Sequence, residues 1–386
     1  MCTGNRCSSI FCLTLFAFLM LVLPQIGNAS NGESRFLLEQ AQPATQEKVD
    51  KTSTSGIRIT DALGRTVTLS QLPQRIIVGG KVSFILIDAL YMFPEAVTRM
   101  AALSKTLQDR VGFISLVEPG LASKTILESE SGPEALLAAK PDLILMKSVN
   151  AEKFGKPLEK LGIPVIYLNL ETPEAFFRDV KIIGQIMGAS ERADEICKLF
   201  ADKQEAITKK SATIPEEKKP RVLIVSSGSR DGSAAFSVPP ASWIQTTMVR
   251  MAGGRPAWLN TPAGDGWSKV GFEQIAAWDP DIVCVISYFS NVDEALAKLV
   301  QATGWKELRA VREGRLYAFP GDYISWDQPD PRWILGLTWL AKTILPQEFK
   351  EINPREEARS FFEKMYGIDA KRFEEAVAPQ LKGSLQ

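Results

Sequence analysis

One thirteen-residue pattern occurs twice in the chain, and no other feature narrows the possible folds as much. EALLAAKPDLILM begins at Glu134, and EQIAAWDPDIVCV begins at Glu273. In each copy a glutamate opens a short helical stretch, Pro-Asp follows, and an apolar run typical of a buried strand comes next. The repeat therefore predicts two halves that are built alike.

A long helix is predicted between the two copies of the repeat. Residues 190–212 contain no Gly or Pro and place apolar side chains near helical spacing. Such a helix would be about 35 Å long, enough to connect two small lobes. On both sides of it, short apolar runs alternate with helical stretches, which indicates mostly parallel sheets covered by helices. The predicted fold class is α/β, with two Rossmann-like lobes joined by a single long backbone helix.

The first 55 residues differ in composition from the rest of the chain. Residues 1–29 read as a signal peptide, with Arg6 as the only charge, an apolar run at 10–23 and small residues at 27–29. No cysteine stands at the expected cleavage point, so no lipoprotein signal is seen. Residues 30–55 are polar and predict a flexible linker. We place the first lobe at 56–189, the helix at 190–213, the second lobe at 214–346 and a C-terminal helical extension of open role at 347–386.

Composition and missing motifs exclude several functions. The 45 basic and 45 acidic residues argue against a nucleic-acid binder, and the absence of histidine removes His-based triads and His-rich zinc sites. The usual nucleotide-binding and hydrolase motifs are missing. Cys197 and Cys284 are expected to be buried free thiols rather than a disulfide. An enzyme would be left with Asp, Glu, Lys, Tyr or Ser, and Asp265, Asp322 or Asp327 could then serve as acid–base groups.

Three further segments carry a resemblance to a known family. They are ITDALGRTVTLSQLPQRIIV from Ile59, FSVPPASWIQTTMVRMAGG from Phe236 and WDQPDPRWILGL from Trp326. With the paired repeat, they resemble the periplasmic substrate-binding proteins of ABC transporters for iron–siderophore complexes and cobalamin, over about residues 56–346. The resemblance implies a ligand cleft between the lobes, little hinge motion and no catalysis.

The same resemblance implies a membrane partner. Members of that family dock onto a permease dimer of the inner membrane through two acidic residues, a role that would fall on Glu134 and Glu273. We expect a periplasmic monomer with no cofactor, no metal site of its own and no nucleic-acid partner.

Ligand-binding residues are expected in the loops that follow the strands, because the crevice of an open parallel sheet lies at the carboxyl ends of its strands. Cations in these loops would suit an anionic chelate, and aromatic rings would offer flat apolar walls. The candidates are Lys81, Lys147, Arg230, Trp267, Tyr288, Phe289, Tyr323 and Trp326. The alternative interpretation is that Tyr323 and Trp326 merely pack a loop and that Arg332 is a solvated or structural cation.

The ligand remains open among several classes. An iron(III)–siderophore comes first and a corrinoid second, because both require a wide aromatic cleft. An oxyanion such as molybdate or tungstate is third, since it would need several converging donors. Haem would require a tyrosine ligand such as Tyr288 or Tyr323. The competing classes are an enzyme in the same cleft and a ligand-free docking or sensor protein.

Overall fold

The computed structural model describes residues 56–105, 113–128, 130–230, 233–259 and 266–385. The signal peptide and linker expected at residues 1–55, and Asp265, lie outside the described residues. Within the described ranges, no helix combines the length and the apolar character needed to span a membrane.

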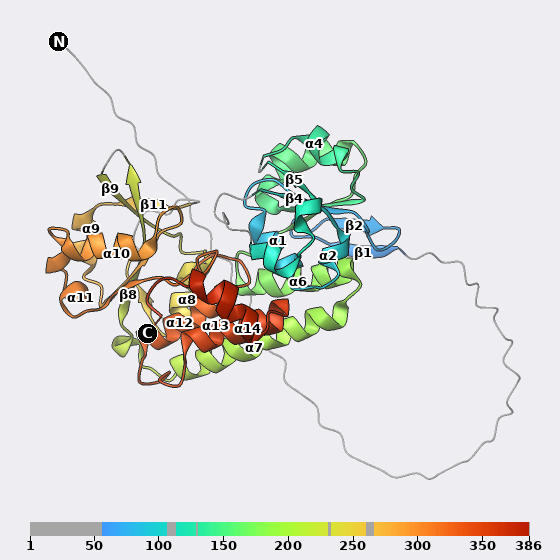
Figure 1. Ribbon diagram of the computed structural model, residues 1–386. Helices are drawn as coiled ribbons and strands as arrows, with labels where there is room; N and C mark the ends of the chain where they lie inside the picture. Colours follow the sequence, from blue (N-terminus) through green and yellow to red (C-terminus); the bar gives the residue numbers. More distant parts are fainter. Residues whose placement is uncertain (1–55, 106–112, 129, 231–232, 260–265, 386) are drawn as a thin grey trace, which may run out of the picture. The chain divides into compact units, whose positions relative to one another are not determined.

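The first lobe, residues 57–187, is built on a parallel five-stranded sheet in the order β5-β4-β3-β6-β7 (Figure 1). A predicted hairpin, β1 (Ile57–Thr60) with β2 (Thr66–Leu69), precedes the sheet. The sheet strands are β3 (Ile76–Gly79), β4 (Met100–Ser104), β5 (Thr125–Leu127), β6 (Leu143–Lys147) and β7 (Val165–Leu168). The helices are α1 (Phe84–Leu90), α2 (Ala96–Arg99), α3 (Phe113–Val117), α4 (Pro133–Ala138), α5 (Lys156–Lys160) and α6 (Pro173–Met187). β3, β6 and β7 are buried along their whole length, as expected for strands covered on both faces.

The second lobe, residues 221–344, contains a mixed six-stranded sheet. Its order is β11-β9-β8-β12-β13, with β10 also paired to β8; the pairs of β8 with β10 and β12, and of β12 with β13, are parallel. The strands are β8 (Arg221–Arg230), β9 (Ser233–Val238), β10 (Arg255–Pro256), β11 (Ser268–Val270), β12 (Ile282–Ile286) and β13 (Leu316–Ala318). The helices are α8 (Ile244–Met251), α9 (Phe272–Trp278), α10 (Val292–Gln301), α11 (Arg309–Arg312) and α12 (Trp333–Ile344).

One element of the second lobe differs from the prediction. The sequence suggested that the strand beginning at Val222 ends near Ser226 and is followed by a loop. Instead β8 continues to Arg230 and pairs antiparallel with β9 as a hairpin. Two residues, Asp231-Gly232, separate the strands, and Asp-Gly is among the favoured sequences of two-residue hairpin connections. That signal was present in the sequence and was missed.

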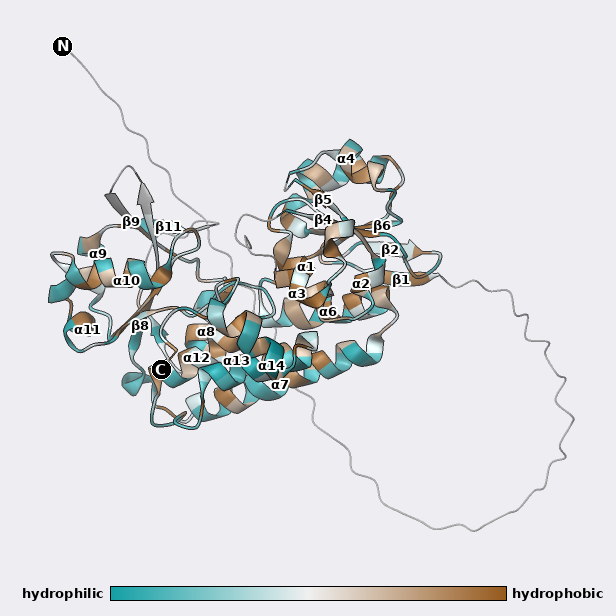
Figure 2. Ribbon diagram, in the orientation of Figure 1, coloured by the Kyte–Doolittle hydropathy of each residue, from teal (hydrophilic) through white to brown (hydrophobic). Residues whose placement is uncertain are grey.

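The long helix α7 (Ser190–Ser211) confirms the predicted connection between the lobes. Its buried stripe, which includes Ile196, Phe200 and Ile207, packs on α6 of the first lobe and on α8 and α12 of the second. The outward side chains are mostly charged, so hydrophilic and hydrophobic residues alternate along the helix in Figure 2. Cys197 on this helix and Cys284 on β12 are both buried free thiols, as predicted.

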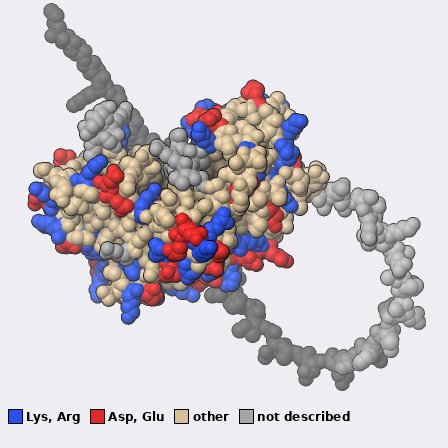
Figure 3. Space-filling model, in the orientation of Figure 1, with Lys and Arg blue, Asp and Glu red and all other residues tan. Residues whose placement is uncertain are grey.

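The C-terminal extension packs on both lobes. α13 (Pro354–Tyr366) contacts α12, and its Phe361 lies edge-on to Phe200 of α7. Tyr366, its last residue, donates a hydrogen bond of 3.1 Å to the backbone carbonyl of Asp88 in α1. α14 (Ala370–Arg372) follows, and Arg355 of α13 pairs with Glu374 in the turn after α14. Figure 3 shows that acidic and basic side chains are interspersed on this face of the molecule.

Candidate functional site

The two glutamates of the repeat occupy equivalent positions. Glu134 lies in the first turn of α4 and Glu273 in the first turn of α9, each after an N-cap glycine, and both are exposed. In both places a glutamate Oε2 lies 3.2 Å from where a Cβ on that glycine would be. Neither carboxylate forms an ion pair with any residue that the structure describes. Two exposed, unneutralised carboxylates are thus presented in the same way by the two lobes.

The aspartates of the two Pro-Asp pairs have a structural role. Asp142 accepts hydrogen bonds from the backbone N–H groups of Gln74 (2.7 Å) and Arg75 (2.9 Å), which precede β3. Asp281 accepts one of 2.6 Å from the backbone N–H of Arg221, the first residue of β8. Each aspartate therefore ties the start of its own strand to the start of the neighbouring central strand.

Lys81 and Lys147, the predicted cations of the first lobe, are both paired with glutamates. Lys147, at the end of β6, is buried and contacts the carboxylate of Glu171. Burial lowers the pKa of Lys147, and Glu171 only partly opposes this effect. Lys81 is exposed and lies 3.2 Å from a carboxylate oxygen of Glu130. Both charges are therefore neutralised within the lobe.

The loop that carries Lys81 is fixed by a residue that the sequence did not single out. Asn150 accepts a hydrogen bond from the Lys81 N–H (2.9 Å) and donates one to the Lys81 carbonyl (3.0 Å). Gly80 has a φ of +85°, and a Cβ on it would lie 2.6 Å from the Asn150 side chain. Only glycine fits this close approach.

Three aromatic rings of the second lobe come together beside the end of β12. Trp243, at the start of α8, lies edge-to-face with Trp267, with ring centroids 5.8 Å apart. Trp267 in turn lies 6.0 Å from Tyr288, and all three residues are half-buried. The prediction named Trp267 and Tyr288 but not Trp243. Phe289, the next residue, is 71% exposed and stands outside this cluster.

A buried carboxylate lies behind the rings. Asp327 accepts hydrogen bonds from the Tyr288 hydroxyl (2.5 Å), the Gln245 amide (3.0 Å) and the Ser325 hydroxyl (2.6 Å). Burial raises the pKa of Asp327, although these three donors oppose the shift. Burial and the charge of Asp327 also raise the pKa of Tyr288 well above its usual value. Tyr288 is therefore a neutral phenol whose ring orientation is set by Asp327.

Tyr323 and Trp326, two further candidates, belong to the core. Trp326 has no exposed surface and donates its indole N–H to Asp322 (2.8 Å), while Tyr323 is 9% exposed and donates its hydroxyl to the Ala376 carbonyl (2.9 Å). Both residues therefore pack the loop after β13, which is the alternative interpretation given in the sequence analysis. Arg230 ends β8, and its side chain is not among those described.

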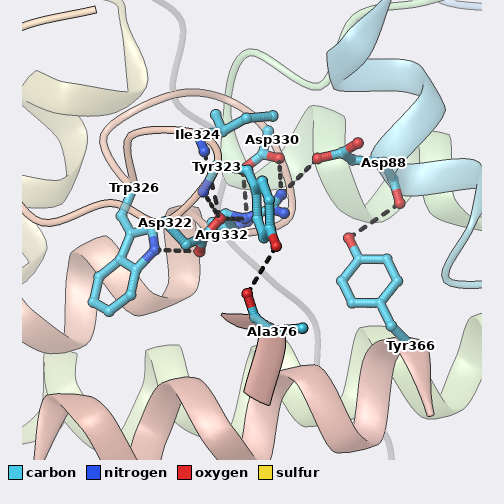
Figure 4. Close-up of polar contacts among 9 residues, drawn as sticks. All are labelled: Asp88, Asp322, Tyr323, Ile324, Trp326, Asp330, Arg332, Tyr366 and Ala376. Atoms are coloured by element: carbon cyan, nitrogen blue, oxygen red, sulfur yellow. Dashed lines mark hydrogen bonds and ion pairs between the residues drawn. The ribbon is translucent and has the colours of Figure 1, made fainter. Parts of the chain in front are cut away.

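Arg332 is a structural cation that joins the two lobes (Figure 4). Its guanidinium is fully buried and bonds to Asp322 (2.7 Å) and Asp330 (2.7 Å) of the second lobe and to Asp88 (2.5 Å) of α1 in the first. It also stacks on Phe113, 4.5 Å from the ring centroid. The two carboxylates considered as acid–base groups, Asp322 and Asp327, are thus both engaged in buried hydrogen bonds.

Comparison with known proteins agrees with this architecture. Residues 124–323, just over half of the chain, match the family described as periplasmic binding protein. The molybdate-binding protein MolA of Haemophilus influenzae is 20% identical over 62% of this chain and 70% of its own length. Its molybdate-bound structure superposes with a TM-score of 0.67 at 18% identity, covering 81% of this chain and 98% of MolA.

Two further proteins are similar. The uncharacterized ABC transporter substrate-binding lipoprotein YvrC of Bacillus subtilis is 28% identical over 56% of this chain and 66% of its own length. The crystal structure of a periplasmic solute binding protein of Veillonella parvula superposes with a TM-score of 0.68 at 20% identity, covering 83% of this chain and 96% of that one. Together with the two α/β lobes joined by α7, the match over residues 124–323 shows that the chain belongs to the periplasmic binding protein family.

Proposed function

We propose that this protein is the solute-binding component of an ABC importer and that it captures a bulky metal chelate, most readily an iron(III)–siderophore. The observation that carries the proposal is the half-buried aromatic cluster of Trp243, Trp267 and Tyr288 at the carboxyl end of β12. Ligand crevices of open α/β sheets lie at that edge, and aromatic rings bind large apolar ligand surfaces. A corrinoid is the alternative with the same requirement for wide apolar walls.

In this proposal the exposed candidates contact the ligand and the buried ones support them. Lys81, Trp267, Tyr288 and Phe289 keep surface open to a ligand, whereas Tyr323 and Trp326 hold the loop after β13 in place. Lys147 ends β6 in the first lobe, and its ammonium group would contact the ligand only if Glu171 were displaced from it.

An oxyanion is the second candidate, and the similarity to MolA favours it. Tetrahedral oxyanions are held by several converging N–H donors or unpaired cations. The two described lysines of the predicted set are already neutralised by Glu130 and Glu171, which argues for the chelate instead.

The delivery step in the proposal uses Glu134 and Glu273. Both are exposed, lie at the starts of equivalent helices and carry no intramolecular cation among the described residues. Charge-assisted hydrogen bonds to arginines of a permease dimer would suit a reversible encounter. We place this encounter at the periplasmic face of an inner membrane.

A titration followed by tryptophan fluorescence tests the ligand class. The purified protein is mixed in turn with a ferric trishydroxamate chelate, a ferric tricatecholate chelate, cobalamin and molybdate, and the affinities are repeated by calorimetry. We expect saturable binding of a chelate, with micromolar or tighter affinity, and no chemical turnover. Saturable binding of molybdate alone would assign the second candidate, and the absence of binding to all four would overturn the proposed function.

A further inference from the structure

The aromatic cluster of the second lobe has the geometry of a cation site. Trp243, Trp267 and Tyr288 come from three separate segments, and adjacent rings stand at 85° and 70° to each other. Aromatic rings present electron-rich faces, which attract organic cations more strongly than neutral groups. All three side chains retain exposed surface, so the cluster is reachable from solvent.

The residue behind the cluster carries a carboxyl group that pairs with no cation of the described chain, so a ligand cation beside it would stabilise its ionised form. Asp327 is 0% exposed, and its three side-chain hydrogen-bond donors, from Tyr288, Gln245 and Ser325, are all uncharged. In the described part of the chain, no Lys or Arg forms an ion pair with it. This differs from Asp322 and Asp330, which share the buried Arg332.

An unused acceptor belongs to a side chain that is hydrogen-bonded to Asp327. The Gln245 side chain is 3% exposed and donates its amide to Asp327, but its carbonyl oxygen Oε1 is buried without a hydrogen-bond partner. A buried acceptor left unpaired is unfavourable, and a donor supplied by a ligand would satisfy it. The rings, the carboxylate and the amide carbonyl therefore all favour a positively charged N–H group.

We propose that this cation site, formed by Trp243, Trp267, Tyr288, Gln245 and Asp327, binds an ammonium group carried by the captured chelate. The inference rests on the proposed function and narrows its ligand by charge. Three hydroxamates balance the charge of a ferric ion, so a trishydroxamate with a free amine is a monocation, whereas a tricatecholate is a trianion. The positive charge of the monocation is complementary to the proposed site, whereas the negative charge of the trianion is not.

A pair of ligands that differ only at the amine tests the proposal in the unaltered protein. One is the ferric chelate of a linear trishydroxamate with a terminal ammonium group; the other is the same chelate with that amine acetylated. We expect the ammonium form to bind roughly five- to thirty-fold more tightly, the range of a partly to fully desolvated cation–aromatic contact. Equal affinities, or tighter binding of the acetylated chelate or the tricatecholate, would overturn the inference.

Three variants show whether the named residues cause the difference. In Asp327→Asn the advantage of the ammonium chelate over the acetylated chelate should shrink at least five-fold. Asp202→Asn removes one exposed charge from α7 and should leave both affinities unchanged. Trp267→Leu keeps Asp327 intact and should also reduce the advantage. A full advantage retained in both Asp327→Asn and Trp267→Leu contradicts the assignment.

The failures of the two proposals are distinguishable. If no chelate and no cobalamin bind, the proposed function fails, and the charge preference fails with it. If chelates bind but the ammonium group brings no gain, the proposed function stands and only the cation site is rejected.

Discussion

Replacing Arg332 with methionine should strongly destabilise the protein, because this one side chain neutralises carboxylates from both lobes. It is 0% exposed and donates to Asp88, Asp322 and Asp330, each of which is at most 2% exposed. Without the guanidinium, three buried carboxylates would face one another with no cation. The variant must then bind protons at this cluster or open it to water.

The expected loss follows from these contacts. Removing one partner of a buried, hydrogen-bonded ion pair typically costs about 3–5 kcal/mol. The cation–aromatic contact with Phe113 adds about 1 kcal/mol. We expect Arg332→Met to lower the free energy of unfolding by about 3–5 kcal/mol at pH 7.5, since protonation of the carboxylates limits the penalty.

The effect of replacing Asp330 on stability should depend on pH in a definite direction. Burial raises the pKa of Asp330, and Arg332 only partly opposes that shift. A carboxyl whose folded-state pKa is raised contributes stability below its unfolded pKa, near 4, and loses that contribution as the pH rises through the folded-state pKa. Asp330→Asn removes the charge permanently, so its stability relative to the unaltered protein should increase as the pH rises from 4 to 8.

Urea unfolding followed by circular dichroism measures these differences, with the slope against urea checked for constancy. Arg359→Met is the matched control, because Arg359 pairs with Glu356 on the partly exposed face of α13 and should change stability by less than about 1 kcal/mol. A loss in Arg332→Met no larger than that of the control would refute the reasoning.

Three other perturbations have definite expected outcomes. The double variant Glu134→Ala, Glu273→Ala should abolish uptake in a transport assay while ligand affinity in calorimetry stays unchanged; lost affinity would contradict a docking role. The double variant Lys147→Met, Glu171→Met should keep or raise the thermal midpoint, because replacing a largely buried ion pair by apolar side chains is often neutral or stabilising by about 1–4 kcal/mol; a lower midpoint would show that the ion pair is net stabilising. Gly383→Ala should lower the free energy of unfolding in urea by at least about 2 kcal/mol, because Gly383 has a φ of +89° and a Cβ on it would lie 2.7 Å from a backbone atom. Gly314 has a φ of +69° but open space around it, so Gly314→Ala should cost only about 1 kcal/mol. Equal losses in the two variants would contradict the steric argument.

The fold was predictable because its signals are local. Residues 190–212 were expected to form one helix, and α7 ends one residue short of that range. The repeated Pro-Asp correctly marked the starts of β6 and β12. What these aspartates bind could not be predicted, since their partners Arg75 and Arg221 lie 67 and 60 residues away in the sequence.

The site was less predictable than the fold, because the sequence does not show which charged side chains are neutralised after folding. A sequence shows where lysines and arginines stand, but their availability to a ligand depends on carboxylates brought near them by folding. Lys147 meets Glu171, 24 residues away, and Arg332 meets Asp88, 244 residues away. The aromatic rings remain candidates for ligand contact, because an apolar face is not cancelled by a neighbour as a charge is. Asp327 is the converse case: within the described ranges, folding surrounds this carboxyl group, which was considered for acid–base chemistry, with neutral side-chain donors and no cation. The positive charge that we propose for the ligand is accordingly inferred from a carboxyl group that folding leaves without a cation among the residues that the structure describes.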